Sequence, residues 1–172
     1  ACFALWGLGA AGVGMNPLYS LRQLSGIAVD SGVRWVVTSD HPASIGKLRE
    51  LAAQVGCRLI VCRADAADLA GGPPPDLCDG EVALSDLLEA APARGWGEPE
   101  VEALAMIQYT GGTTGAPKGA MLSHRNIWFA AHQIRNWLHR IRDGREAWYA
   151  AAPFSHITGL VNYIVEPAIV GG

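Results

Sequence analysis

Residues 109–119, Tyr-Thr-Gly-Gly-Thr-Thr-Gly-Ala-Pro-Lys-Gly, constrain the structure of this chain more than any other segment. They contain four glycines, three threonines and a single lysine. Glycine lets the backbone adopt positive φ and approach a ligand closely, so that successive N–H groups can point at an anion. The threonine hydroxyls add hydrogen-bond donors, and Pro117 stiffens the loop just before Lys118. The composition therefore predicts a loop that holds phosphate.

The segments on either side of this loop agree with that interpretation. Residues 104–107, Leu-Ala-Met-Ile, form a short apolar run that is typical of a buried strand, and residues 119–122 form a second one. Ser123 then stands where a helix begins. A glycine turn without a ligand would need neither the strand nor the lysine. In a Walker A loop the lysine precedes Ser or Thr and opens a helix, so Lys118 must instead reach phosphate from a loop between two strands.

The loop resembles the signature of the adenylate-forming superfamily, which comprises acyl- and aryl-CoA synthetases, luciferases and the adenylation domains of peptide synthetases. That signature is approximately Tyr-Thr-Ser-Gly-Thr-Thr-Gly-x-Pro-Lys-Gly, and only Gly111 differs, standing where serine is most usual. The resemblance continues at residues 123–126, Ser-His-Arg-Asn, and at residues 153–160, Pro-Phe-Ser-His-Ile-Thr-Gly-Leu. Residues 16–19, Asn-Pro-Leu-Tyr, are similar to a stretch found upstream of both. The matches are in the family's order and span nearly the whole chain.

This resemblance implies a fold and an activity. The implied fold is α/β, with a mostly parallel sheet flanked by helices, as in the large N-terminal domain of these enzymes. The implied activity is ATP-dependent activation of a carboxylic acid to an acyl-adenylate, followed by thioester formation with coenzyme A, with Mg²⁺ as the cofactor. The implied nucleotide-binding residues are Thr110, Gly111, Gly112, Thr113, Thr114, Gly115, Lys118 and Gly119, of which Lys118 is also catalytic.

His156 is the residue that the resemblance assigns to the substrate. In CoA synthetases the matching histidine lies between the nucleotide site and the acyl pocket, whereas amino-acid-activating relatives carry an aspartate in a Phe-Asp-x-Ser pattern. Residues 154–156, Phe-Ser-His, offer no such acid, which favours a fatty or aryl acid as the substrate, although Ser155 stands where an aromatic residue is usual. A histidine at such a turn could instead cap a helix or fill space, and the sequence leaves both roles open.

The length of the chain limits what it can do by itself. Enzymes of this family are roughly three times as long as these 172 residues. We therefore expect residues 1–172 to be a partial N-terminal domain, without the family's ribose-binding aspartate and C-terminal domain, and hence a partial enzyme that is inactive alone. The alternatives are a truncated or degenerate nucleotide-binding or interaction module, and an adenylation domain that acts on another acid.

Composition and charge narrow the class of protein. Half of the residues are hydrophobic, as expected for a packed core, and the net charge of -3 argues against a nucleic-acid-binding protein. The four cysteines lack metal-ligand spacing and fit a reducing cytoplasm. The apolar N-terminus lacks a basic start and falls short of the roughly 20 residues that a membrane span requires. We expect a cytoplasmic protein without a transmembrane segment, whose partners are a carboxylic acid and ATP.

Predicted helices and strands alternate through the first half of the chain. Apolar residues recur at helical spacing after Ser20, a plausible N-cap, and again over residues 45–55 before Gly56. Short apolar runs at residues 35–37 and 59–61 predict strands, and this alternation favours a parallel sheet. The glycine- and proline-rich residues 64–80 predict a surface loop or insertion, after which a short helix resumes behind Ser85.

The longest predicted helix begins at Ser123. Its apolar stripe extends from Ile127 to Ile141, and its arginines and histidines favour a solvated face over an RNA-binding surface. His132 and His139 have no acidic partner at a spacing that would mark a metal or catalytic site. We therefore expect both histidines to be surface or packing residues.

Residues 7–12, Gly-Leu-Gly-Ala-Ala-Gly, match the dinucleotide-binding fingerprint Gly-x-Gly-x-x-Gly. A Rossmann site requires a strand before these glycines and a helix that opens on the third one. Here the predicted order is the reverse, with a helix over residues 1–9 and a strand over residues 13–16. We therefore expect no NAD or FAD site.

Overall fold

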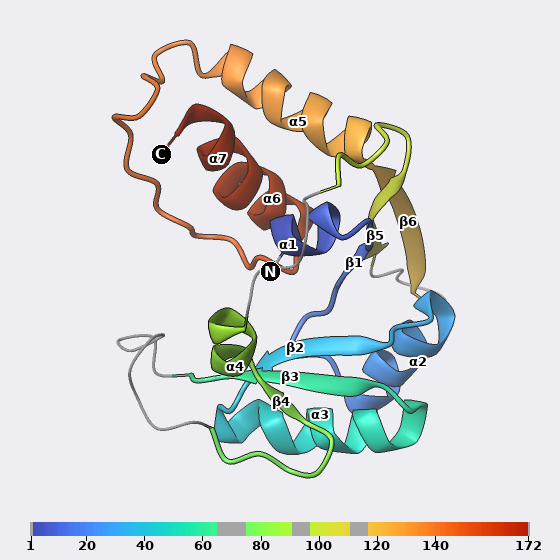
Figure 1. Cartoon of the computed structure of the whole chain (residues 1–172). Coiled ribbons are helices and arrows are strands. Elements are labelled where there is room, and N and C mark those ends of the chain that lie inside the picture. The colour runs from blue at the N-terminus through green and yellow to red at the C-terminus, as the bar shows by residue number, and fades with distance from the viewer. Residues whose placement is uncertain (1, 65–74, 91–96, 111–116, 172) are drawn as a thin grey trace. The chain divides into compact units, whose positions relative to one another are not determined.

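The computed structural model describes residues 2–64, 75–90, 97–110 and 117–171 (Figure 1). Contacts within the chain divide it into two compact units, the first comprising residues 17–95 and the second residues 2–16 and 96–172. The described residues of each unit form one three-stranded sheet. No described helix has the length and apolar character needed to cross a membrane.

The first unit is a parallel arrangement of strands and helices. Its strands pair in the order β2-β3-β4, and both pairings are parallel. Helix α3 packs against β2, β3 and helix α2. The prediction of a parallel sheet built from alternating helices and strands is therefore confirmed here. The elements are α2 (Leu21–Ser31), β2 (Trp35–Ser39), α3 (Pro42–Val55), β3 (Arg58–Cys62), β4 (Val82–Ala83) and α4 (Leu84–Glu89).

Local polar groups define the helix ends of the first unit. Ser20 caps α2 in a reciprocal capping box with Gln23. Gly56 ends α3 in the left-handed conformation, with φ of 72°. A bidentate ion pair joins Arg49 of α3 to Glu81, with N···O distances of 2.8 and 2.9 Å, and these hydrogen bonds lower the pKa of the Glu81 carboxyl. The predicted cap at Ser20 and the predicted stop at Gly56 are confirmed.

The prediction for the start of α4 is wrong by a small margin. The N-cap of this helix is Ala83, which makes no side-chain capping bond, and Ser85 lies inside the first turn. The cause is that β4 runs directly into α4, so no loop precedes the helix. Of the predicted insertion at residues 64–80, residues 65–74 lie outside the described residues, while residues 75–80 form neither helix nor strand.

The second unit contains a mixed sheet with the strand order β1-β5-β6. β1 pairs with β5 in parallel, whereas β5 and β6 are antiparallel. The helix-then-strand order predicted for the N-terminus is confirmed, because α1 precedes β1. The elements are α1 (Cys2–Gly7), β1 (Gly12–Gly14), β5 (Leu104–Thr110), β6 (Lys118–Ser123), α5 (His124–Trp137), α6 (Ile157–Leu160), the π-helix η2 (Val161–Val165) and α7 (Glu166–Val170).

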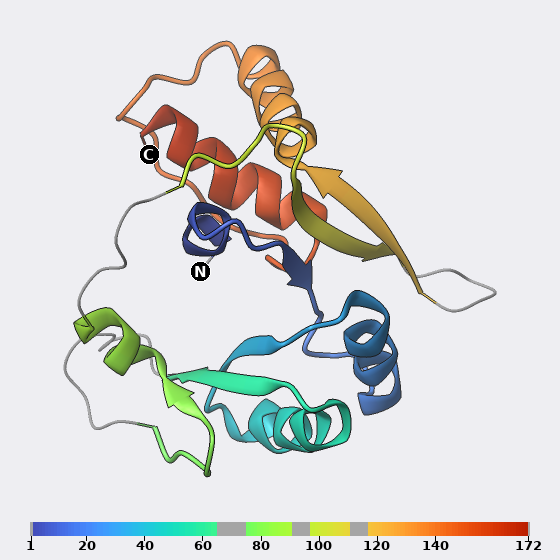
Figure 2. The ribbon, with the colours of Figure 1, turned by 45° about the vertical axis from the view of Figure 1, so that its right-hand side comes forward.

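The core of the second unit lies between its helices and β5. The indole Nε1 of Trp6 donates a hydrogen bond to the carbonyl oxygen of Ala105 at 2.8 Å and so ties α1 to this strand. Helix α5 contacts both η2 and α7, and Figure 2 shows it beside the C-terminal helices. The buried apolar residues of this core are Trp6, Ala105, Met106, Ile127, Ala131, Leu160, Val161 and Val165.

Helix α5 begins where the sequence predicts and ends earlier. Ser123 is its N-cap, in a capping box with Asn126. The helix stops at Trp137, so the prediction that its apolar stripe continues to Ile141 is wrong. Arg135 explains the difference, because its guanidinium donates to the carbonyl oxygen of Ile141 at 3.1 Å and pairs with Asp143, which holds these residues in a turn.

The C-terminal helical segment contains one wide turn. The N–H of Glu166 donates to the carbonyl oxygen of Val161, five residues back, as in a π-helix. Glu166 is completely buried, and neither of its carboxylate oxygens has a hydrogen-bond partner in the described chain. Burial raises the pKa of this carboxyl, and the charge of Arg135 offsets part of that effect.

Candidate functional site

The predicted phosphate loop joins the two strands of an antiparallel hairpin. In the β5–β6 register, Tyr109 is opposite Gly119 and Thr110 is opposite Lys118. The first and last residues of the signature are therefore neighbours across the hairpin. Gly111, Gly112, Thr113, Thr114 and Gly115 lie outside the described residues, whereas Thr110, Lys118 and Gly119 are described.

Gly119 is required where it stands because the two strands pack closely. A Cβ added at this position would lie 2.7 Å from the Cγ2 of Ile107 and 3.1 Å from the ring of Tyr109. The Tyr109 side chain is buried, with 6% of its surface exposed. Any larger residue at position 119 would displace this ring, so the tyrosine and the glycine at the two ends of the signature form one packing unit.

Lys118 lies at the first position of β6 and is exposed. The hydroxyl of Thr110 donates to the Lys118 carbonyl oxygen at 3.4 Å, which ties the two strands together at the base of the loop. Within the described ranges, no carboxylate pairs with the Lys118 ammonium group. The charge of this lysine is therefore available to an anion.

His156 lies at the N-terminus of α6, in the second matching segment. Its Nδ1 accepts a hydrogen bond from the N–H of Thr158 at 3.2 Å, so the histidine caps the helix. Because Nδ1 is an acceptor, the neutral ring carries its proton on Nε2 and can donate from that atom. The capping role left open by the sequence is thus present, and the ring still offers one donor to a substrate.

Glycine is also required for steric reasons at position 159, in this second matching segment. A Cβ added at Gly159 would lie 2.1 Å from the carbonyl oxygen of Pro153 and 3.0 Å from the Cα of Phe154. The turn that presents His156 therefore folds back tightly on the start of α6. Only glycine fits there without moving the turn.

Gln108 connects the two segments, and sequence reasoning missed it. It immediately precedes Tyr109 on β5, and its Nε2 donates to the carbonyl oxygen of Ser155 at 2.9 Å. A Cβ added at Gly14 would lie 2.7 Å from this same carbonyl oxygen. The signal that could have identified Gln108 is an amide side chain that directly follows the apolar run of residues 104–107. The structure thus brings the end of β5 and the His156 turn together.

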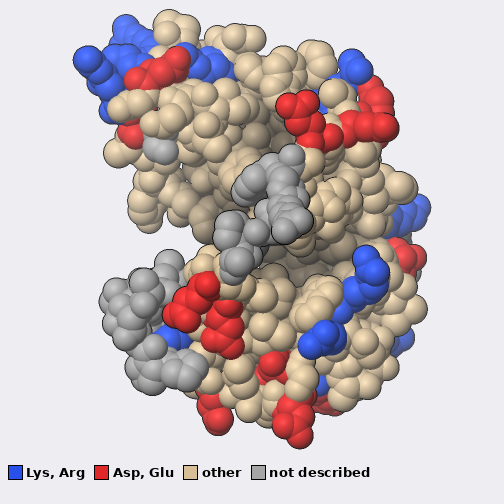
Figure 3. All heavy atoms as spheres, viewed as in Figure 1, with Lys and Arg blue, Asp and Glu red and all other residues tan. Residues whose placement is uncertain are grey.

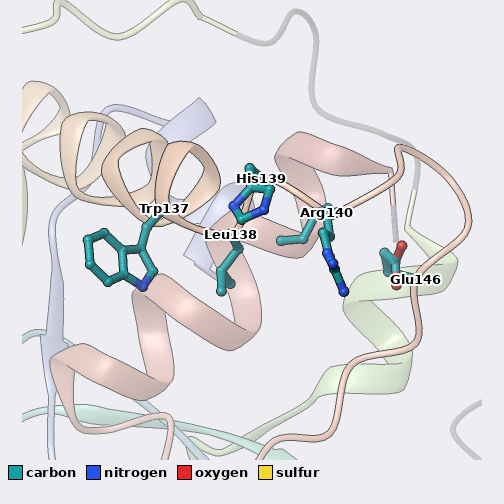
Figure 4. A pocket seen from close by; sticks show the side chains of 6 residues that line it. Trp137, Leu138, His139, Arg140 and Glu146 are labelled. Atoms are coloured by element: carbon teal, nitrogen blue, oxygen red, sulfur yellow. The ribbon is translucent and has the colours of Figure 1, made fainter.

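A pocket of about 280 Å³ lies at the end of α5, away from the predicted site residues (Figure 4). None of the described residues of the phosphate loop or the His156 turn lines it, so we assign it no role in binding. Its lining residues are Trp137, Leu138, His139, Arg140, Ile141 and Glu146.

Basic side chains gather near this pocket, together with acidic ones, at the upper left of Figure 3. Arg135 pairs with Asp143 and Arg142 pairs with Glu146, which agrees with a solvated charged surface. His132, by contrast, packs with its ring centroid 3.9 Å from that of Trp128. The expectation of surface or packing roles for His132 and His139 agrees with these positions.

The described residues do not provide a metal site. No cluster of three or more His, Cys, Asp or Glu side chains that could hold an ion is found in residues 2–64, 75–90, 97–110 and 117–171. The described side-chain oxygens of the hairpin strands are those of Gln108, Tyr109, Thr110 and Ser123, and none of them is a carboxylate. This donor set does not fit protein-held Mg²⁺, which is usually bound through one or two carboxylates.

The chain is similar to several characterised proteins. It is 30% identical over 177 residues to the long-chain-fatty-acid–CoA ligase of Salmonella typhimurium. This match covers 91% of the chain and 31% of that ligase. It is 42% identical over 72 residues to the long-chain-fatty-acid–CoA ligase of Bacillus subtilis, covering 40% of this chain and 13% of that protein. The structure of ATP-bound MatB from Rhodopseudomonas palustris matches with a TM-score of 0.75 and 25% identity, over 98% of this chain and 30% of MatB.

These similarities confirm the α/β fold of an adenylate-forming enzyme that the motifs predict. The chain spans 31% of the length of the Salmonella ligase, the relative that it matches over most of its own length. A family model described as "AMP-binding enzyme" matches residues 1–172, and the chain belongs to that family.

Proposed function

We propose that the protein carrying this sequence uses ATP to activate a carboxylic acid as an acyl-adenylate and then transfers the acyl group to the thiol of coenzyme A. The observation that carries this proposal is the hairpin, in which Tyr109 pairs with Gly119 and the exposed Lys118 lies at the base of the loop. The names of the ligases from Salmonella and Bacillus support it.

Each part of the loop has a role in the proposed reaction. The backbone amides of Gly111, Gly112 and Gly115 and the hydroxyls of Thr110, Thr113 and Thr114 hold the β- and γ-phosphates, which leave together as pyrophosphate. Lys118 neutralises the charge that grows on this leaving group. The substrate carboxylate attacks the α-phosphorus directly, so the protein needs to supply position and charge but no nucleophilic side chain. Mg²⁺ is the cofactor that the family implies, and we derive no step through it from these residues.

The acid in this proposal is a fatty or aryl acid. His156 faces the acid, donating from Nε2 while Nδ1 caps α6. Residues 154–156 carry no carboxylate that could receive a substrate amine, which disfavours an amino acid. The similarity to long-chain-fatty-acid–CoA ligases supports a fatty acid.

We propose further that residues 1–172 belong to the N-terminal domain of a longer cytoplasmic enzyme. The chain covers 31% of the Salmonella ligase, which supports a longer enzyme. A cytoplasmic location is supported by the free cysteines, because free thiols fit a reducing compartment. They are Cys2, Cys57, Cys62 and Cys78.

Exchange of labelled pyrophosphate into ATP, with fatty, aryl and amino acids added one at a time, tests this function. We expect exchange that depends on added acid and that is fastest with fatty or aryl acids. Separate measurement of ATP binding is the control. A protein that binds ATP yet exchanges no pyrophosphate with any acid would contradict the proposed activity and favour the nucleotide-binding module.

A further inference from the structure

The peptide unit that joins Ser155 to His156 is held at both ends. Its carbonyl oxygen accepts a hydrogen bond from Nε2 of Gln108 at 2.9 Å, and its N–H donates to the carbonyl oxygen of Pro153 at 3.0 Å. The His156 ring is held as well, through the bond between Nδ1 and the N–H of Thr158. Of these three hydrogen bonds, only the bond from Gln108 comes from outside the turn.

Gln108 belongs to the strand that leads into the phosphate loop. Side chains alternate between the two faces of a strand, so Gln108 and its neighbour Tyr109 point in opposite directions. The ring of Tyr109 lies beside Gly119, whereas the side chain of Gln108 donates a hydrogen bond to Ser155. The last residues of β5 therefore contact the hairpin partner on one face and the His156 turn on the other.

The chemistry of the amide fixes the orientation of Gln108. The Ser155 carbonyl oxygen can only accept, so the amide nitrogen must face it, and the reverse orientation would place two oxygens against each other. Only 9% of the Gln108 surface is exposed, and its Oε1 is buried without a partner among the described residues. Leaving a buried oxygen unpaired costs free energy. An apolar side chain would avoid this cost, so packing alone does not account for glutamine at this position.

Two glycines let the turn lie close to the strands. A Cβ added at Gly14 of β1 would lie 3.1 Å from Oε1 of Gln108 and 2.7 Å from the carbonyl oxygen of Ser155. A Cβ at Gly159 would meet the carbonyl oxygen of Pro153. The turn therefore rests directly on the backbone of β1, and the hydrogen bond from Gln108 fixes its position along β5.

We propose that Gln108 is a positioning residue, which holds the His156 turn against β5 and so sets the place of the acid relative to the phosphate loop. The inference rests on the proposed function for the part that concerns the acid. Gln108 does not touch the substrate, and it acts through the peptide unit of His156.

Amide hydrogen exchange tests the positioning role without any assay of activity. Gln108→Met keeps the length of the side chain and removes the donor, and Gln108→Leu is a second variant should the first fail to fold. We expect exchange at the N–H groups of His156 and Thr158 to become about fivefold to tenfold faster, the effect of losing one hydrogen bond. Unchanged exchange at both groups would overturn the proposal, whether or not the protein is an active ligase.

The matched control is Trp6→Phe, which removes another hydrogen bond to β5, at Ala105. This variant should lower the overall stability and leave the exchange at His156 equal to that of other amides of similar protection. Selective loss of protection at His156 and Thr158 in Trp6→Phe would show that any weakening of β5 loosens the turn, and would also overturn the specific role of Gln108.

Kinetics in a double-mutant cycle test the link to the acid. We expect Gln108→Met to lower kcat/KM for the acid about tenfold, with KM for ATP changed by less than about twofold. In a His156→Ala background the same change should have an effect of less than about twofold, because the residue it positions is gone. Independent, multiplicative losses would overturn the proposal. If the wild-type protein shows no acid-dependent exchange of pyrophosphate, the proposed function fails, and the hydrogen-exchange result still decides the role of Gln108.

Discussion

Both units of this chain contain glycines with positive φ, among them Gly9, Gly144 and Gly171 in the second unit, but among the described residues only the second unit has glycines that are closely packed. In the first unit, Gly32, Gly56 and Gly80 have φ values of 64°, 72° and 84°, and a Cβ added at any of them would have nothing within 4 Å. These glycines are needed for backbone conformation. In the second unit an added Cβ would come within 3.0 Å of another atom at Gly12, Gly14, Gly119 and Gly159. These glycines are needed for space.

Buried polar groups differ between the units in the same way. In the first unit Arg49 and Glu81 satisfy each other through two hydrogen bonds. The residues with buried side-chain atoms that lack a partner in the described chain, Gln108, Trp148 and Glu166, all belong to the second unit. Natural proteins depart from complete satisfaction and regular packing mainly at functional or strained sites. The comparison agrees with the proposal that the site lies in the second unit, which contains both signature segments.

The largest expected difference is between two lysines, one in each unit. Lys118→Ala should slow acid-dependent pyrophosphate exchange by about tenfold to a thousandfold, because it removes one preorganised charge from the phosphate loop. Lys47→Ala is the matched control, since Lys47 donates to the carbonyl oxygens of Pro17 and Tyr19 and so supports only the local fold. We expect its exchange rate to stay near that of the wild type. Equal losses in the two variants would break the comparison.

Substituting alanine at two different glycines is expected to change the free energy of unfolding in opposite directions. Gly159→Ala should lower the free energy of unfolding by about 3 kcal/mol, because its Cβ overlaps the Pro153 carbonyl. Gly46→Ala, inside α3 with open space around it, should raise that free energy by about 0.5 to 1 kcal/mol, because alanine loses less backbone entropy in a helix. Urea denaturation measures both. Similar changes in the free energy of unfolding for the two variants would show that the close packing around Gly159 does not affect stability.

The smallest expected effect is a difference in pH dependence between two glutamates. Burial raises the pKa of Glu166, so the stability that this residue contributes is present in acid and is lost as the pH rises through its native pKa. Glu166→Gln should therefore raise the melting temperature by a few degrees at pH 8 and by less at pH 4. Hydrogen bonds from Arg49 lower the pKa of Glu81, so its contribution is present at neutral pH and is lost as the pH falls.

The matched variant Glu81→Gln should accordingly lower the melting temperature most at pH 8. Thermal unfolding followed between pH 4 and pH 8 compares the two variants directly. A gain from Glu166→Gln that does not depend on pH would mean that the carboxyl has the same pKa in the native and unfolded states, and would contradict the effect of burial.

Much of the fold follows from signals that lie within a few residues of one another. Ser20 and Ser123 cap their helices, each bonded to a residue three positions later, and Gly56 ends α3. Such contacts depend on local chemistry, so the sequence predicts them. The end of α5 could not be predicted in this way, because it depends on Arg135 turning back to Ile141 rather than on the apolar pattern.

In the candidate site, too, the sequence predicts local features but not contacts between distant residues. The composition of residues 109–119 predicts a loop between two strands, and the register of Tyr109 with Gly119 agrees with it. The role of Gln108 depends on a contact with Ser155, which is 47 residues away in the sequence. The need for glycine at position 159 likewise depends on how tightly the turn folds back. Neither fact is visible in the spacing of residues along the chain.

The wide turn at Val161–Val165 explains how a carboxylate came to lie in the core. An α-helix advances by about 100° per residue, so residues five apart differ by about 140° in direction. Here burial recurs at intervals of five, from Leu160 to Val165 to Val170 and from Val161 to Glu166. The extra residue in the turn brings Glu166 to the same side of the segment as Val161. Glu166 is therefore buried because of the number of residues between it and Val161, and deleting one residue from the turn would rotate its carboxylate away from that side.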